Sequence, residues 1–116
     1  MDYIHIDSLL FKGRHGVGSV ERSVEQEFSV SVRLGVVVGS VGKSDRLEDT
    51  VDYKDIKNKI QAVIEGESRY LLERIAEDIA IKILENSRIQ TVEITIKKST
   101  VWDNGIPGVT ITRTNP

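Results

Sequence analysis

The sequence of 116 residues contains no cysteine and only two histidines, His5 and His15. Without cysteine there is no disulfide, no thiolate nucleophile, and no cysteine-based zinc or iron–sulfur site. Two histidines cannot form a histidine cluster for a metal either. We therefore expect no metal site, and His15 has the character of an ordinary polar loop residue.

Long apolar runs and clusters of one charge are also missing. No stretch approaches the ~18 apolar residues that a membrane-spanning helix requires, and the first seven residues resemble no signal peptide. The 16 basic and 18 acidic residues are dispersed, for a net charge of -2, and form no basic face for nucleic acid. We expect a cytoplasmic protein that binds neither membranes nor nucleic acid.

Several widespread catalytic motifs are absent too. The sequence has no GxGxxG, P-loop, GxSxG or HExxH motif, which argues against dinucleotide-binding enzymes, nucleoside triphosphatases, serine hydrolases and zinc proteases. The composition, 39% hydrophobic and 29% charged, is that of a globular protein. A chain of this length is expected to form one domain, residues 1–116.

Alternation of apolar and polar residues predicts four strands. The first two cover residues 4–11 and 28–38, and the second alternates most clearly, with apolar residues at 28, 30, 32, 34, 36 and 38. The last two cover residues 92–98 and 109–112. The glycine-rich segments 12–19 and 39–44 break the alternation and are predicted to be loops.

Helical periodicity lies between the second and third strands. One helix is predicted from about Tyr53 to Glu65, with Asp52 as its cap, and another from about Leu72 to near Asn86. The order ββααββ predicts an α+β fold, an antiparallel four-stranded sheet with two helices on one face. Because the sheet has two open edges, we expect a homo-oligomer in which sheets join into a barrel.

Three side chains at the ends of these elements are candidates for chemistry. Lys98 continues the aliphatic face of the third strand, where a partly desolvated ammonium can act as acid or base, although such lysines commonly reach back to water. Glu73, beside Leu71 and Leu72, can accept two parallel hydrogen bonds from a pterin or guanine edge, or form an ordinary surface pair. Tyr53 can stack on a heterocycle or simply pack.

Four blocks of sequence resemble the dihydroneopterin aldolase family. They are GRHGV at 13–17 followed by Glu21, DTVDY at 49–53, LLERIAE at 71–77 and VEITIKK at 92–98. Residues 4–113 are similar to the family in segment order and length. The resemblance implies the tunnelling fold, in which subunits form a tetrameric ring or an octamer of two stacked rings, with sites at the subunit interfaces.

The resemblance also implies a reaction and its residues. 7,8-Dihydroneopterin would be cleaved to 6-hydroxymethyl-7,8-dihydropterin and glycolaldehyde without a cofactor, because the ring imine itself accepts the electron pair. The implied catalytic residues are Lys98, Tyr53 and Glu21, with Tyr53 supplied across an interface. The implied substrate-binding residues are Glu73 as the pterin anchor, Leu72, Leu71, Tyr53, Asp52 and Val17.

Two other functions compete with the aldolase. A related epimerase acts on dihydroneopterin triphosphate, whose phosphates would need additional cations such as Arg14, Arg22 or Lys97. A non-catalytic pterin or purine binder would need only Glu73 and a stacking surface. The chain also departs from the family pattern, with Ser99 where proline often follows the lysine. This departure bears on substrate specificity more than on fold.

Overall fold

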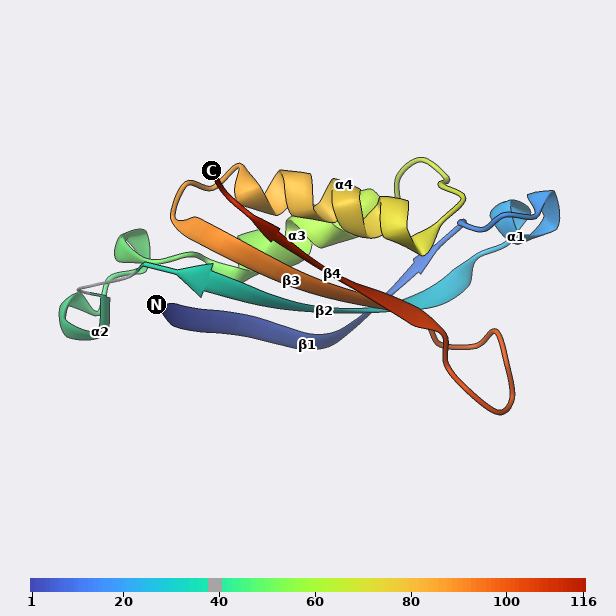
Figure 1. Ribbon diagram of the computed structural model, residues 1–116, viewed down its shortest axis with the longest axis horizontal. Helices are drawn as coiled ribbons and strands as arrows, with labels where there is room; N and C mark the ends of the chain where they lie inside the picture. Colours follow the sequence, from blue (N-terminus) through green and yellow to red (C-terminus); the bar gives the residue numbers. More distant parts are fainter. Residues whose placement is uncertain (38–40) are drawn as a thin grey trace.

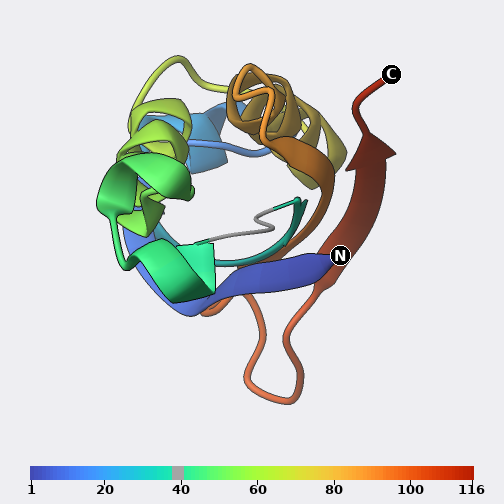
Figure 2. The ribbon, with the colours of Figure 1, turned by 90° about the vertical axis from the view of Figure 1, so that its left-hand side faces the viewer.

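The computed structural model describes residues 1–37 and 41–116. Its antiparallel sheet has the order β1-β2-β3-β4, formed by β1 (Asp2–Gly13), β2 (Gln26–Val36), β3 (Ile89–Lys98) and β4 (Gly108–Thr114). Two long helices, α3 (Tyr53–Ile64) and α4 (Leu72–Leu84), lie on one face of the curved sheet (Figure 1, Figure 2). The predicted α+β class and the ββααββ order of the main elements are confirmed.

Apolar residues from both layers meet between the helices and the sheet. The predicted inward positions of β2 that the structure describes are buried, and so are the apolar stripes of both helices and alternate residues of β3. Burial of this alternating set is what fixes the faces of the strands. Asp52 caps α3 as predicted, because its Oδ1 accepts a hydrogen bond of 2.9 Å from the Lys54 N–H.

Three short elements were not predicted. They are α1 (Ser19–Ser23), α2 (Val41–Ser44) and the 3-10 turn η1 (Leu47–Asp49). The predicted loop 12–19 is shorter at both ends, since Gly13 still pairs with Gln26 and Ser19 begins α1. The predicted loop 39–44 was wrong over 41–44, because one helical turn is too short to leave a period in the sequence. Val38 and residues 39–40 lie outside the described residues.

The outer strands of the sheet are β1 and β4. Among the residues that the structure describes, each of them is hydrogen-bonded to a strand on one side. The β1–β2 register shifts between Ile6 and Leu9, where Ser8 has a φ of 56° and donates its N–H to Ser31 Oγ at 2.9 Å. In the described part of the chain, no helix is long and apolar enough to cross a membrane.

Candidate active site

A cleft of about 220 Å³ lies where β3 ends, α4 begins and the loop 14–18 passes. It brings together four of the predicted site residues, Leu71, Leu72, Glu73 and Lys98. Its other lining residues are His15, Gly16, Tyr70, Ile75 and Pro107. Residues from both halves of the sequence therefore line the same cleft.

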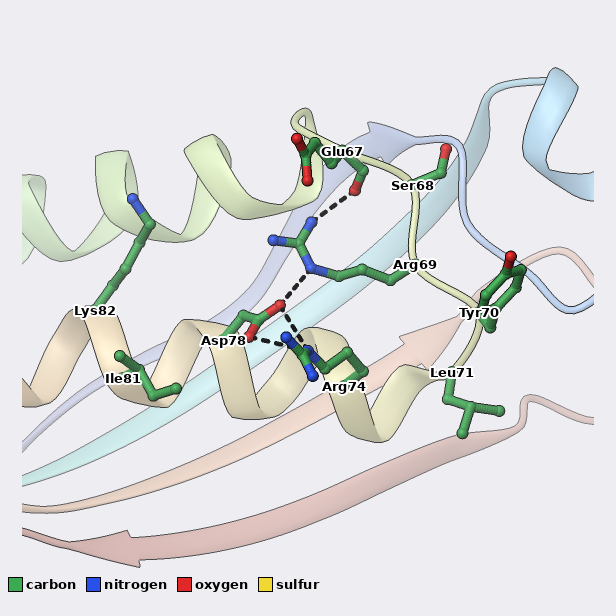
Figure 3. Close-up of a pocket in the computed structure, with 9 residues that line it drawn as sticks. All are labelled: Glu67, Ser68, Arg69, Tyr70, Leu71, Arg74, Asp78, Ile81 and Lys82. Atoms are coloured by element: carbon green, nitrogen blue, oxygen red, sulfur yellow. Dashed lines mark hydrogen bonds and ion pairs between the residues drawn. The ribbon is translucent and has the colours of Figure 1, made fainter.

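A larger hollow of about 800 Å³ adjoins this cleft along α4 and shares Tyr70 and Leu71 with it (Figure 3). Two of its lining arginines share one carboxylate, since the partly buried Asp78 accepts hydrogen bonds from Arg69 at 2.5 Å and Arg74 at 3.2 Å. None of the predicted catalytic residues lines it. The smaller cleft is therefore the candidate active site.

Lys98 and Glu21 form an ion pair beside the cleft. Lys98 Nζ donates to Glu21 Oε2 at 2.9 Å, and the lysine side chain is only 14% exposed. The neighbouring Lys97 is exposed on the other face of the sheet. Partial desolvation of Lys98, expected from the phase of the strand, is thus present, and it strengthens the interaction with the carboxylate.

Glu21 is held on the short helix α1 by its own loop. Its Oε1 accepts the Gly18 N–H at 3.2 Å, and its carboxylate packs against Gly16, where an added Cβ would lie 2.7 Å from Oε2. The hydrogen bond from Lys98, followed by that from Gly18, lowers the pKa of the Glu21 carboxyl. The carboxylate is therefore charged at neutral pH and forms an ion pair with the side chain of Lys98.

Glu73 occupies the first turn of α4, whose positive dipole end favours an anion. Its carboxylate lines the cleft and is exposed, and it makes no hydrogen bond or ion pair with any residue of the described segments. Leu71, the residue before the helix, has no side-chain acceptor for the first N–H groups. Because the Glu73 carboxylate is exposed at this point, it can accept hydrogen bonds from a planar donor pair.

His15 is a site residue that periodicity missed. It is 1% exposed; its Nδ1 accepts the Arg69 N–H at 3.0 Å, so its Nε2–H donates to the Ile64 carbonyl at 2.8 Å. Its ring meets Phe28 edge-on at 5.3 Å. Burial lowers the pKa of His15, which keeps it neutral. The nearby Gly13, whose Cβ would lie 2.4 Å from the Ile64 oxygen, is the sequence signal of this close packing.

Four predicted site residues do not line the cleft of their own chain, and one of them, Glu21, contacts its wall through Lys98. Tyr53 is 67% exposed and begins α3, at the end of the molecule where α4 ends, whereas the cleft lies where α4 begins (Figure 1). Asp52 caps the same end of α3. Val17 is exposed on the loop 14–18, next to Gly16. Tyr53 and Asp52 can reach such a cleft only on another copy of the chain.

A lysine–carboxylate pair beside a helix-terminal glutamate, on this α+β scaffold, provides the groups that an acid–base enzyme uses. Residues 4–112 match the family model described as dihydroneopterin aldolase. The chain belongs to the dihydroneopterin aldolase family, whose members are carbon–carbon lyases.

Individual relatives agree with this assignment. The chain is 39% identical to dihydroneopterin aldolase 1 of Arabidopsis thaliana, over 86% of the chain and 69% of that protein. It is 35% identical to dihydroneopterin aldolase of Staphylococcus epidermidis, over 92% of the chain and 87% of that protein. The crystal structure of E. coli dihydroneopterin aldolase in complex with neopterin superposes with a TM-score of 0.91 at 29% identity, covering 97% and 99% of the two chains.

Proposed function

We propose that the protein cleaves 7,8-dihydroneopterin by a retro-aldol reaction to 6-hydroxymethyl-7,8-dihydropterin and glycolaldehyde, a step of folate biosynthesis. The observation that carries the proposal is the 2.9 Å pair of Lys98 and Glu21 beside a cleft that Glu73 also lines. Membership of the aldolase family supports the reaction, and the neopterin bound to the E. coli relative supports a pterin as the ligand.

The proposed chemistry divides between an anchor and a proton-transfer pair. Glu73 accepts hydrogen bonds from the amino group and ring N–H of the pterin, which orients the side chain of the substrate toward Lys98. The 2′-hydroxyl loses its proton as the bond between the first two side-chain carbons breaks. The electron pair of the broken carbon–carbon bond moves into the ring imine, and glycolaldehyde leaves.

Lys98 is the group we assign to exchanging protons with the 2′-hydroxyl and the ring nitrogen N5, directly or through a water. Glu21 keeps the lysine in place and positions the substrate side chain. Tyr53 of a neighbouring copy reprotonates the remaining carbon, and Asp52, Leu71, Leu72 and Val17 complete the proposed binding surface.

This division requires an oligomer, which we propose as part of the function. The two outer strands, β1 and β4, offer open hydrogen-bonding edges that can pair between copies and close a barrel. A tetrameric ring, or two such rings stacked as an octamer, would deliver Tyr53 of one subunit to the cleft of the next. We place the enzyme in the cytoplasm, in keeping with its lack of cysteine.

The structure offers little support for a triphosphate substrate. Arg22 already donates to the carbonyls of Gly16 and Val17, Arg14 lines a different hollow beside Glu25, and Lys97 extends from the opposite sheet face. None of these three cations lines the cleft. The lysine–glutamate pair likewise exceeds what a non-catalytic binder needs, so cleavage of the unphosphorylated substrate is favoured over both alternatives.

The test is to incubate the purified protein with 7,8-dihydroneopterin and to follow both products by chromatography. We expect wild-type protein and Lys97→Ala to form both products, Lys98→Ala to form neither, and Glu73→Ala to need much more substrate. Epimerisation of the triphosphate without cleavage would favour the epimerase. Normal turnover in Lys98→Ala would overturn the assignment of the lysine.

A further inference from the structure

Arg22 connects three segments at the edge of the cleft. Its Nη1 donates to the carbonyl of Gly16 at 3.0 Å and to that of Val17 at 2.7 Å. Its guanidinium carbon lies 4.6 Å from the centre of the Tyr70 ring. Gly16 and Tyr70 both line the cleft, and Arg22 directly follows Glu21 in α1.

The helix that carries Glu21 has little packing of its own. α1 spans five residues, Ser19–Ser23, and none of them is buried. Gln26 holds its inner side, donating to the carbonyls of His15 and Glu21 at 3.0 and 2.8 Å. On its outer side, Arg22 and Tyr70 join α1 to the segment that leads into α4.

Arginine is suited to this connection because its planar guanidinium can donate hydrogen bonds in its plane while one face stacks on an aromatic ring. Lysine, with a compact ammonium, cannot do both in the same way. Tyr70 immediately precedes Leu71 and Leu72, and Glu73 follows in the first turn of α4. The stacked pair therefore connects the catalytic side of the cleft with the pterin-anchoring side.

We propose that Arg22 and Tyr70 are positioning residues for the cleavage reaction. Their stacking fixes α1 against the approach to α4 and so holds the carboxylate of Glu21 at Lys98 with the geometry that turnover requires. The inference rests on the proposed function for its kinetic consequence, whereas the positioning itself can be measured without activity.

Hydrogen–deuterium exchange of the full-length protein tests the positioning directly. In Arg22→Gln and in Tyr70→Leu, amides of residues 16–23 should exchange at least about threefold faster than in the wild type, because local opening of this segment becomes easier. Arg14→Gln, a matched loss of an exposed arginine whose ion pair with Glu25 spans 3.9 Å, should leave these amides unchanged. Unchanged exchange in both Arg22→Gln and Tyr70→Leu would overturn the proposal, whether or not the protein cleaves dihydroneopterin.

Kinetics test the role in the reaction. Arg22→Gln should lower kcat about tenfold or more while KM changes less than about twofold, since small misplacement of a catalytic group is costly and Glu73 stays on α4. Arg22→Lys should recover little of the loss, whereas Tyr70→Phe should recover most of what Tyr70→Leu loses. The double variant Arg22→Gln with Tyr70→Leu should be no slower than the worse single variant.

Failure of the proposed function and failure of the positioning role give different results. A wild-type protein that does not cleave dihydroneopterin would refute the proposed function, and the exchange measurement would still decide the positioning. Faster exchange in the variants with unchanged kcat would refute the role in catalysis. A uniform loss of folded protein, with normal kcat per folded chain, would show a merely structural contact and would also overturn the proposal.

Discussion

Replacing His15 by leucine should destabilise the protein far more than its position in a glycine-rich loop suggests. The imidazole joins the loop 14–18 to the end of α3 through the Ile64 carbonyl, and to the segment before α4 through the Arg69 N–H. Leucine keeps a comparable apolar volume but offers neither a donor nor an acceptor. Both backbone groups would then be left without a partner, the Ile64 carbonyl at a buried position and the Arg69 N–H at a partly buried one.

The magnitude follows from these contacts. Each buried backbone group left unsatisfied costs about 1–3 kcal/mol, and loss of the edge-on contact with Phe28 adds about 0.5–1.5 kcal/mol. The free energy of unfolding should fall by about 2.5–7.5 kcal/mol, a large part of the ~5–15 kcal/mol of a typical domain. The melting temperature should fall by at least about 10 °C.

Urea unfolding followed by circular dichroism measures this loss, with His5→Leu as the matched control. The side chain of His5 is 63% exposed and lies 3.4 Å from Asp7, so its replacement should change stability by less than about 0.5 kcal/mol. A loss below about 1 kcal/mol in His15→Leu would refute the argument that the imidazole satisfies buried groups.

Three further predictions concern pH, a glycine and a partly buried ion pair. The free energy of unfolding should be constant above pH ~6.5 and fall as the pH drops below it. The reason is that burial lowers the pKa of His15 in the folded protein, so the unfolded chain binds more protons at acidic pH. The urea midpoints of the wild type and of His15→Leu should therefore converge on acidification. Gly16→Ala, at a φ of 154°, should lower kcat about tenfold by displacing Glu21, while Gly42→Ala, in open space, should not. Asp78→Asn should cost about 2–3 kcal/mol in urea unfolding, because the Arg69 guanidinium loses its carboxylate.

Periodicity predicted the main elements because it records which face of each strand and helix is buried. It predicted the orientation of Lys98 for the same reason, since the lysine continues the phase of Ile94 and Ile96. The pairing of Lys98 with Glu21 could not be read this way. It depends on the β2–β3 register, which sets Phe28 opposite Lys98, and on a single turn of helix with no buried face.

Other parts of the site escape a single sequence for different physical reasons. His15 packs against residues 64 and 69, whose proximity is a product of the folded loops rather than of any local pattern. Tyr53 begins α3 at the end of the molecule away from the cleft, so the role proposed for it requires another copy of the chain. Both residues lie in the sequence blocks that resemble the family, but the groups around them cannot be predicted from those blocks.

The separation of 77 residues between Glu21 and Lys98 has a consequence for synthesis. A growing chain can form the β1–β2 hairpin and both helices before β3 exists, yet it lacks the lysine until β3 has been made. A nascent chain or a fragment cut before β3 lacks Lys98 and Pro107 from the wall of the cleft, and by the proposed mechanism it is inactive. By the proposed mechanism, substrate in the cell can stabilise only chains that already contain β3.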